Sequence, residues 1–338
     1  MDMNAIIKLA LDLTKGVQSF SYAGKEYSAS EASEVLRQAL KDANGGSSKI
    51  DYKSMRRNKV EVFEIIEELV PAIINEGLQG NEFWTSYVDE RNLALGDQND
   101  FVVPDNHTFV VTEIADGIAT PRRQRIGKST TMTITPTIHA IRMYEEFGRF
   151  MAGRIDWNEL CNKVANAFQQ AIWSDIYTAF NGITSSTTGM NSTYVKTGVW
   201  DEDTMLTLIS HVEAATGEVA SIVGTKAALR KVTSSVLSNE ARDNSFNYGF
   251  YGKFYGTPEV AVPQVHSVGT DTFVLSDSDI YIIAGDQKFI HFVNEGNATI
   301  VEKDGTVNAD LTVEYLTIMK WGVGVCFAEK SFGKYTIS

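Results

Sequence analysis

The chain has 338 residues, of which 43% are hydrophobic and 22% are charged, and its formal net charge is −13. These fractions are typical of an ordinary globular protein, and the negative charge argues against a protein that grips nucleic acid by counterion release. Two cysteines are too few for a disulfide framework, and no apolar run approaches the ~20 residues of a membrane span. We therefore expect a soluble protein that is made in a cytoplasm.

The first 75 residues are expected to be largely helical. Apolar residues at helical spacing between Ile6 and Leu13 predict one helix, and Ser28 or Ser30 can cap a second that ends before a linker at 44–48. A third helix is predicted over about 56–75, with a kink or break at Pro71. Four acidic residues lie on this third helix, largely away from its apolar positions: Glu61, Glu64, Glu67 and Glu68.

Residues 101–145 show a β pattern instead. From Ile126 to Ala140 apolar and polar side chains alternate, which predicts a long strand with one apolar face. The segment 109–112 is a natural partner strand, and arms of a dozen residues would project ~40 Å at ~3.3 Å per residue. The tip of this ribbon carries a basic cluster: Arg122, Arg123, Arg125 and Lys128.

The strongest predicted helix spans about residues 156–181. Its apolar residues are four apart over a length of ~37 Å. Asp175 lies within this apolar stripe, where we expect either a basic partner or a place at the edge of the stripe. Cys161 in this helix and Cys326 in the last predicted strand are expected to be buried thiols rather than a disulfide.

The remaining chain is expected to be an α/β region after a surface loop at 184–198. Helices are predicted at 201–215 and 226–237 around a buried strand at 219–223, with glycine-rich turns at 248–256. Further strands are predicted, with a break between the last two at Trp321-Gly322: 260–262, 273–275, 279–283, 289–292, 312–319 and 323–327.

Taken in order, these elements resemble the HK97-fold major capsid proteins of tailed bacteriophages. The resemblance covers about residues 55–335 and depends on order and spacing. The stretches that carry it locally resemble the start of the family's axial domain, its glycine-proline turn, a later strand pair and the closing strand: 221–230, 252–262, 274–283 and 321–328. The implied fold is α+β, with an N-terminal arm, a long β-ribbon (the extended loop), a spine helix, a peripheral domain and an axial domain.

The resemblance also implies a division of the chain. Its segments are a helical N-terminal segment at 1–50, an N-arm at 51–100, the extended ribbon at 101–145, a peripheral domain with the spine helix at 146–198, an axial domain at 199–310, and C-terminal strands that return to the peripheral domain at 311–338.

The function implied by the resemblance is that of a major capsid protein. Such a chain would self-assemble into pentamers and hexamers of an icosahedral shell around double-stranded DNA, which its acidic wall would face without specific binding. Its partners would be further copies of itself, together with portal and scaffolding or decoration proteins, and no membrane. Its location would be the virion capsid, and the host cytoplasm during assembly.

No catalytic, cofactor-binding or metal signature is present in the sequence. The five histidines are scattered, and there is no P-loop, GxSxG or GxGxxG motif. Gly322-Val323-Gly324 is interpreted as a strand irregularity. Some relatives form an isopeptide bond between a ribbon lysine and an asparagine, for which Lys128 would be the candidate here. We do not expect that bond, because no sequence signature identifies the asparagine.

The basic tip has two interpretations. It is either a solvated tip, or it lies across a neighbouring subunit and pairs with the acidic helix there. For the chain as a whole, the alternatives to a capsid protein are an encapsulin-type nanocompartment shell protein on the same fold, a soluble enzyme of an unrecognised family, or another virion part.

Overall fold

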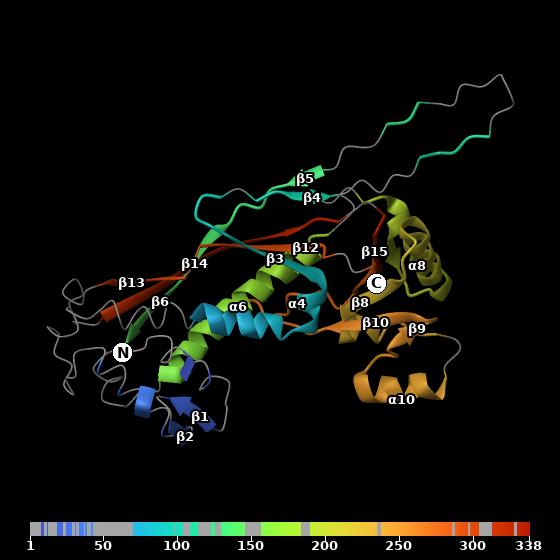
Figure 1. Ribbon diagram of the computed structural model, residues 1–338. Coiled ribbons are helices and arrows are strands. Elements are labelled where there is room, and N and C mark those ends of the chain that lie inside the picture. Colours follow the sequence, from blue (N-terminus) through green and yellow to red (C-terminus); the bar gives the residue numbers. More distant parts are fainter. Residues whose placement is uncertain are drawn as a thin grey trace.

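A computed structural model describes most of the chain beyond residue 69. The described residues are 70–97, 99–103, 109–113, 123–125, 130–145, 157–183, 190–234, 238–285, 288–296, 298–303, 313–327 and 330–338, with short stretches and single positions before residue 43. The fold is α+β, as expected, and ribbon, spine helix and α/β region follow one another in the expected order (Figure 1).

The described part of the N-terminal segment is not helical throughout. Strands β1 (Ser19–Tyr22) and β2 (Lys25–Ser28) form an antiparallel hairpin that pairs Tyr22 with Lys25. The helical prediction missed this hairpin, although the short polar and aromatic alternation around Gly24 is a hairpin signal. Residues 34–36 are helical, as expected of the second helix. The linker at 44–48 and the glutamates of the third helix lie outside the described residues.

A five-stranded sheet is organised by one long strand, β14 (Val313–Val325). Strands β12 (Ile290–Glu295) and β13 (Thr299–Lys303) pair with one side of β14, and β6 (Thr137–Glu145) pairs with the other. Strand β3 (Val88–Leu93) adds in parallel to β12. The predicted break at Trp321-Gly322 is wrong, because β14 continues through both residues. Strand β13 was not predicted.

A six-stranded sheet occupies the other part of the molecule, in the order β7-β15-β11-β8-β10-β9. Its strands are β7 (Val195–Gly198), β8 (Ala220–Thr225), β9 (Lys253–Phe254), β10 (Thr257–Val262), β11 (Asp279–Ala284) and β15 (Phe332–Ile337). The predictions of β8, β10 and β11 are confirmed. The predicted loop at 184–198 is wrong from residue 195 onward, because β7 pairs there with β15.

The helices of this second part differ from the prediction after Leu229. Helix α8 (Glu202–Thr216) begins at the N-cap Asp201, as expected. The predicted helix 226–237 is shorter, since α9 ends at Leu229 (Lys226–Leu229), and an unpredicted helix follows, α10 (Asn239–Tyr248). The predicted strand at 273–275 is only an isolated bridge between Phe273 and His266. The last strand, β15, joins this sheet, whereas β14 belongs to the other.

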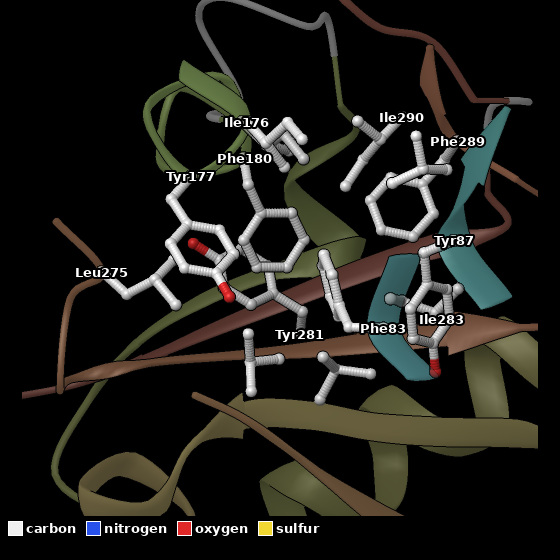
Figure 2. Close-up of a cluster of buried hydrophobic side chains, with 14 of the residues drawn as sticks. Phe83, Tyr87, Ile176, Tyr177, Phe180, Leu275, Tyr281, Ile283, Phe289 and Ile290 are labelled. Carbon is white, nitrogen blue, oxygen red and sulfur yellow. The ribbon is translucent and has the colours of Figure 1, made fainter. Parts of the chain in front are cut away.

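The predicted spine helix is confirmed as α6 (Trp157–Asn181). Its described apolar stripe is buried, and Phe180 near its end joins the two sheets (Figure 2). The ring of Phe180 lies 4.0 Å from that of Tyr281 on β11 and 5.8 Å from that of Phe289, just before β12. Both sheets therefore share one aromatic core with α6.

A second helical layer, formed by residues 70–79 and 82–87, packs against α6. Residues 70–79 are helical, so the third predicted helix runs past Pro71 and beyond its expected end at 75. Gln169 of α6 donates a hydrogen bond to the carbonyl of Ile73 at 3.0 Å. Helix α4 (Glu82–Tyr87) follows and places Trp84 5.2 Å from Phe292 of β12. Helices and the five-stranded sheet are thus packed as adjacent layers.

Truncation of Ile172 tests the spine helix. Its side chain is fully buried in the shared core, so we expect Ile172→Ala to lower the free energy of unfolding by about 2–5 kcal/mol. Asn166→Ala, at an exposed position of the same helix, should change it by about 0.5 kcal/mol or less. Denaturant titration of soluble subunits measures both, and equal effects would contradict the packing described.

Candidate functional site: the projecting ribbon and its anchor

The C-terminal half of β14 has one face with side chains and one face without. Trp321, Val323 and Val325 point to α6 and the shared core, whereas Gly322 and Gly324 point to the opposite face. A Cβ atom on Gly322 would lie 2.7 Å from Ile134 Cγ2 and 3.1 Å from the backbone oxygen of Thr135. The two glycines therefore admit another chain segment directly onto this outer face of the sheet.

That segment is the root of the ribbon. Strands β4 (Phe101–Val103) and β5 (Thr130–Met132) form a small antiparallel sheet above the outer face, with Phe101 opposite Met132 (Figure 1). Phe101, Ile134 and Val293 of β12 form a separate buried apolar cluster there. We call the residues of this contact the ribbon anchor: Asn99, Phe101, Met132, Ile134, Val293, Gly322 and Gly324.

An amide side chain ties the two arms of the ribbon together at the anchor. Asn99, which is buried, donates from Nδ2 to the carbonyl of Ile134 at 2.7 Å and accepts from the amide of Ile134 at 2.9 Å. This pair of bonds copies a strand pairing beyond the end of β5. Both backbone groups of a buried residue are thereby satisfied, which fixes the relative position of the arms.

Charged and aromatic groups of the outer face hold Phe101. The guanidinium carbon of Arg91 on β3 lies 4.0 Å from the centre of the Phe101 ring, and the ring of His291 on β12 lies 4.1 Å from it. Asp89 is 3.3 Å from Arg91 and 3.4 Å from Nδ1 of His291. The Phe101 ring therefore packs against Arg91 and His291, and Asp89 neutralises the charge of Arg91.

Beyond the anchor, the described arm segments 109–113 and 123–125 lie away from the two sheets (Figure 1). Gln124 of the returning arm accepts from the amide of Val110 and donates to its carbonyl, each at 2.7 Å. Phe109, Val110 and Val111 are exposed, Val111 to 94%. A run of exposed apolar side chains on a projecting arm indicates a surface that another molecule covers.

The predicted long strand from Ile126 to Ala140 needs correction. Its described part divides into β5 and β6 around Pro136. The more buried side chains lie at even-numbered positions before Pro136 and at odd-numbered positions after it. Ile134 is buried above the glycines, whereas Ile138, on the same predicted face, is 69% exposed. The cause is that the chain first crosses over the face of β14 and then joins its edge. The predicted partner segment, 109–112, contacts the returning arm at 123–125 through the side chain of Gln124. The strand that pairs with β5 is β4.

The inner face of β14 explains Asp175. The indole Nε1 of Trp321 donates to Asp175 Oδ2 at 2.9 Å, and the ring of His139 on β6 stacks on Trp321 at 3.7 Å. Of the two expectations for Asp175, a half-buried place at the edge of the stripe agrees with the structure, and the partner described for its carboxylate is an indole N–H rather than a base. Phe168 of α6 meets the same indole edge-on. This contact fixes β14, and with it the ribbon anchor, to the spine helix.

Two histidines near the ribbon root have lowered pKa values. Burial of the ring is the main cause of the low pKa of His291, which Arg91 reinforces and Asp89 opposes. Burial likewise lowers the pKa of His139, against the attraction of Asp175. Cys326 is half-buried, and burial raises the pKa of its thiol, while the side chain of Cys161 lies outside the described residues. At His291 and His139, burial therefore favours the neutral imidazole.

The structure describes only part of the predicted interface. Arg123 and Arg125 are exposed on the returning arm of the ribbon, on either side of Gln124. Arg122, Lys128 and the four glutamates at 61, 64, 67 and 68 lie outside the described residues. Within the described part of the chain, no group of three His, Cys, Asp or Glu side chains could hold a metal ion.

Sequence reasoning missed the anchor itself. Asn99, Phe101 and His291 carry no local signal, because their roles depend on contacts with strands far away in the sequence. The alternating glycines were a usable signal, since glycines two apart in a strand leave one face bare. Their interpretation as an irregularity was incomplete: they mark the place where another backbone approaches.

The comparisons with known proteins now give the class. A family model matches residues 3–335, which is nearly the whole chain, and the family that it describes is one of capsid proteins. The chain is a capsid protein. It belongs to the family described as SPbeta prophage-derived putative capsid protein YonB. This membership confirms the capsid prediction and disfavours an enzyme of an unrecognised family. No curated protein matches the chain significantly.

Solved capsid structures are distantly similar. The capsid of the empty GTA particle is 12% identical, with a TM-score of 0.48, over 75% of this chain and 88% of that one. The mature capsid of bacteriophage PhiM1 is 12% identical (TM-score 0.46; 76% and 87%), and a virus-like particle from Pyrococcus furiosus is 11% identical (TM-score 0.46; 80% and 98%). The family assignment rests on the sequence match alone.

None of the helices in the described ranges combines the length and the apolar character that a membrane crossing requires.

Adding a side chain at Gly322 tests the anchor. The new Cβ would meet Ile134 and the backbone at Thr135 and Pro136, so we expect Gly322→Ala to lower the free energy of unfolding by about 1–3 kcal/mol. It should also make the ribbon easier to cleave in limited proteolysis. Gly198→Ala, where a Cβ meets nothing within 4 Å, is the control. Equal stability of the two variants would contradict the close approach.

The environment of His291 predicts a pH dependence. Its pKa in the folded chain lies below the ordinary value of about 6.5, so the unfolded chain binds more protons as the pH falls below 6.5. Its contribution to stability is thus present above that pH and is lost on acidification. We expect His291→Asn to flatten the fall in stability between about pH 6.5 and 5. Denaturant titrations at several pH values measure this, and an unchanged slope would refute it.

Proposed function

We propose that the chain is the major subunit of an icosahedral shell that encloses double-stranded DNA. Membership of the capsid protein family supports this, together with one structural observation: a rigidly anchored ribbon that carries exposed apolar residues away from the body of the molecule. In an assembled shell, a neighbouring copy would cover these exposed residues.

The assembly follows from contacts between two different surfaces of the same chain. Such heterologous contacts form rings when the rotation closes, and rings of five and six copies build a closed icosahedral shell. Each contact would bury ribbon surface on a neighbour. In this proposal, the five-stranded sheet with α6 is the peripheral domain, and the six-stranded sheet with α8 to α10 is the axial domain.

The basic tip supplies the charge in this contact. Arg123 and Arg125 are exposed, and with Arg122 and Lys128 they would pair with the acidic helix of a neighbouring copy at Glu61, Glu64, Glu67 and Glu68. Exposed ion pairs contribute only ~0–1 kcal/mol each, but a shell repeats them at every contact. The pairing would therefore set register and partner choice more than affinity.

The remaining partners follow from the proposed shell. Portal and scaffolding or decoration proteins would complete the particle, and the acidic inner wall would face the packaged DNA without binding it specifically. Assembly would take place in the host cytoplasm. The finished subunit would reside in the virion capsid.

Charge reversal at the ribbon tip tests the proposal. In negative-stain electron microscopy we expect uniform shells from the unaltered protein. Replacing Arg122, Arg123 and Arg125 by Glu should lower the particle yield about tenfold or more while leaving the subunits soluble, because every contact then becomes repulsive. A small uniform oligomer from the unaltered protein would refute the shell, and full yield from the variant would refute the tip contact.

Two controls separate charge from position. Replacing Lys226, Arg230 and Lys288, which are exposed outside the ribbon, by Glu changes the net charge equally and should leave the yield intact. Combining the tip reversal with Lys at positions 61, 64, 67 and 68 should restore assembly, since it re-creates the attraction with opposite signs.

A further inference from the structure

Helix α10 is a helix without a core. None of its ten side chains is buried, and Phe246 is 91% exposed. Its ends are well defined, since Ser238 accepts from the amide of Ala241 and Gly249 ends the helix at φ +90°. A helix of this length is marginal in water unless one of its faces packs against something. Within the described part of one copy, Ala241, Asn244 and Ser245 are only half-buried, and the face that carries Phe246 stays exposed.

The turn that follows α10 carries a strained aromatic residue. Tyr255 lies at φ +46° in the two-residue connection between β9 and β10, a position that favours Gly, Asn or Asp. A non-glycine residue there costs about 1–2 kcal/mol. The hydroxyl of Tyr255 bonds to Glu202 and lies 3.2 Å from the hydroxyl of Ser234, while most of its side chain stays exposed. Strain of this kind at the surface points to a role in recognition.

Three exposed aromatic rings therefore lie within ten residues of chain. We call Phe246, Tyr248 and Tyr255 the tip surface, which is distinct from the basic tip of the ribbon. Tyrosine and other aromatic residues are enriched at the centres of protein interfaces, where they bury a large area at a low entropic cost. The tip surface thus has the composition of a binding surface rather than of a solvated one.

The opposite edge of the same sheet offers a second exposed surface. In the strand order, β9 is at one end, next to α10 in the chain, and β7 is at the other. Val199, directly after β7, is 78% exposed, and Thr197 is exposed as well. Lys196 gives this edge a positive charge, whereas α10 has a net negative charge, since its exposed acids Glu240 and Asp243 outnumber its one exposed base, Arg242.

We propose that the tip surface of one copy packs against the β7 edge, residues 195–199, of the next copy in a head-to-tail ring. The occupant is thus a second copy of this chain. Surfaces at opposite ends of one sheet produce a heterologous contact, which is what ring closure requires. The contact buries the exposed face of α10 and brings Lys196 near Glu240 and Asp243 of that helix. It rests on the proposed shell function and names a contact separate from the ribbon.

Engineered cysteines test this placement directly. Asn247 on α10 and Thr197 on β7 are both exposed, so cysteines there should remain accessible. Under mild oxidation, particles of the double variant Asn247→Cys, Thr197→Cys should give a ladder of linked subunits in non-reducing denaturing gels, ending at rings of five and six. Neither single variant should give a ladder, which controls for the native Cys161 and Cys326.

A substitution pair tests the energetic role. Phe246→Ser should lower the particle yield about tenfold or more, because an exposed ring buried on assembly acts as a hot spot. Phe273→Ser removes an equally apolar exposed ring from a different turn and should leave the yield unchanged. Both changes lie at exposed positions, and thermal melts of the subunits verify that each variant is folded.

The outcomes separate this inference from the proposed function. Particles without a cysteine ladder, or full yield from Phe246→Ser, overturn the contact between the tip surface and the β7 edge. The proposed shell function is unaffected by either result. Failure of the unaltered protein to form particles refutes the shell function. In that case, cross-linking of the concentrated soluble double variant decides the contact separately: linked chains support it, and unlinked monomers refute it.

Discussion

The structure depends on the alternation of side chains along the last residues of β14. Trp321, Val323 and Val325 give the strand its contact with the spine helix, while Gly322 and Gly324 leave the reverse face bare for the ribbon root. Another backbone can approach the second face this closely only because Gly322 and Gly324 place no side chain there. Strand β12 pairs directly with this stretch, and β3 pairs with β12, so the strands that hold Phe101 are positioned by it.

The spine helix extends this constraint to the rest of the molecule. Asp175 holds the indole of Trp321, and one and a half turns later Phe180 packs between Tyr281 and Phe289. Further on, Lys334 of β15 forms a buried ion pair with Asp279 of β11 and reaches the carbonyl of Ile183, just beyond the helix. The ribbon and the six-stranded sheet are therefore both fixed to the C-terminal half of the spine helix.

The sequence was informative where a local pattern decides the structure. The four-residue spacing of Phe168, Ile172, Ile176 and Phe180 predicted the spine helix almost to the residue, and continuous apolar stretches predicted β8 and β11. It failed where tertiary contacts decide. Nothing local shows that Ile134 lies over a sheet and Ile138 beside one, that Trp321-Gly322 continues a strand, or that Asn99 pairs with a distant backbone. Glycine was interpreted as an interruption because its usual effect on strands is to weaken them.

The anchor also determines how the molecule carries a mechanical load. A pull on the ribbon reaches β5 and β6 and is passed to β14, which is hydrogen-bonded along its length to three other strands. Because β6 lies antiparallel to β14 over nine residue pairs, tension along it acts as shear, and many backbone bonds would have to break together. A strand attached only by its end would peel away one bond at a time. Internal pressure on a closed particle would thus be resisted by whole ladders of bonds rather than by single contacts.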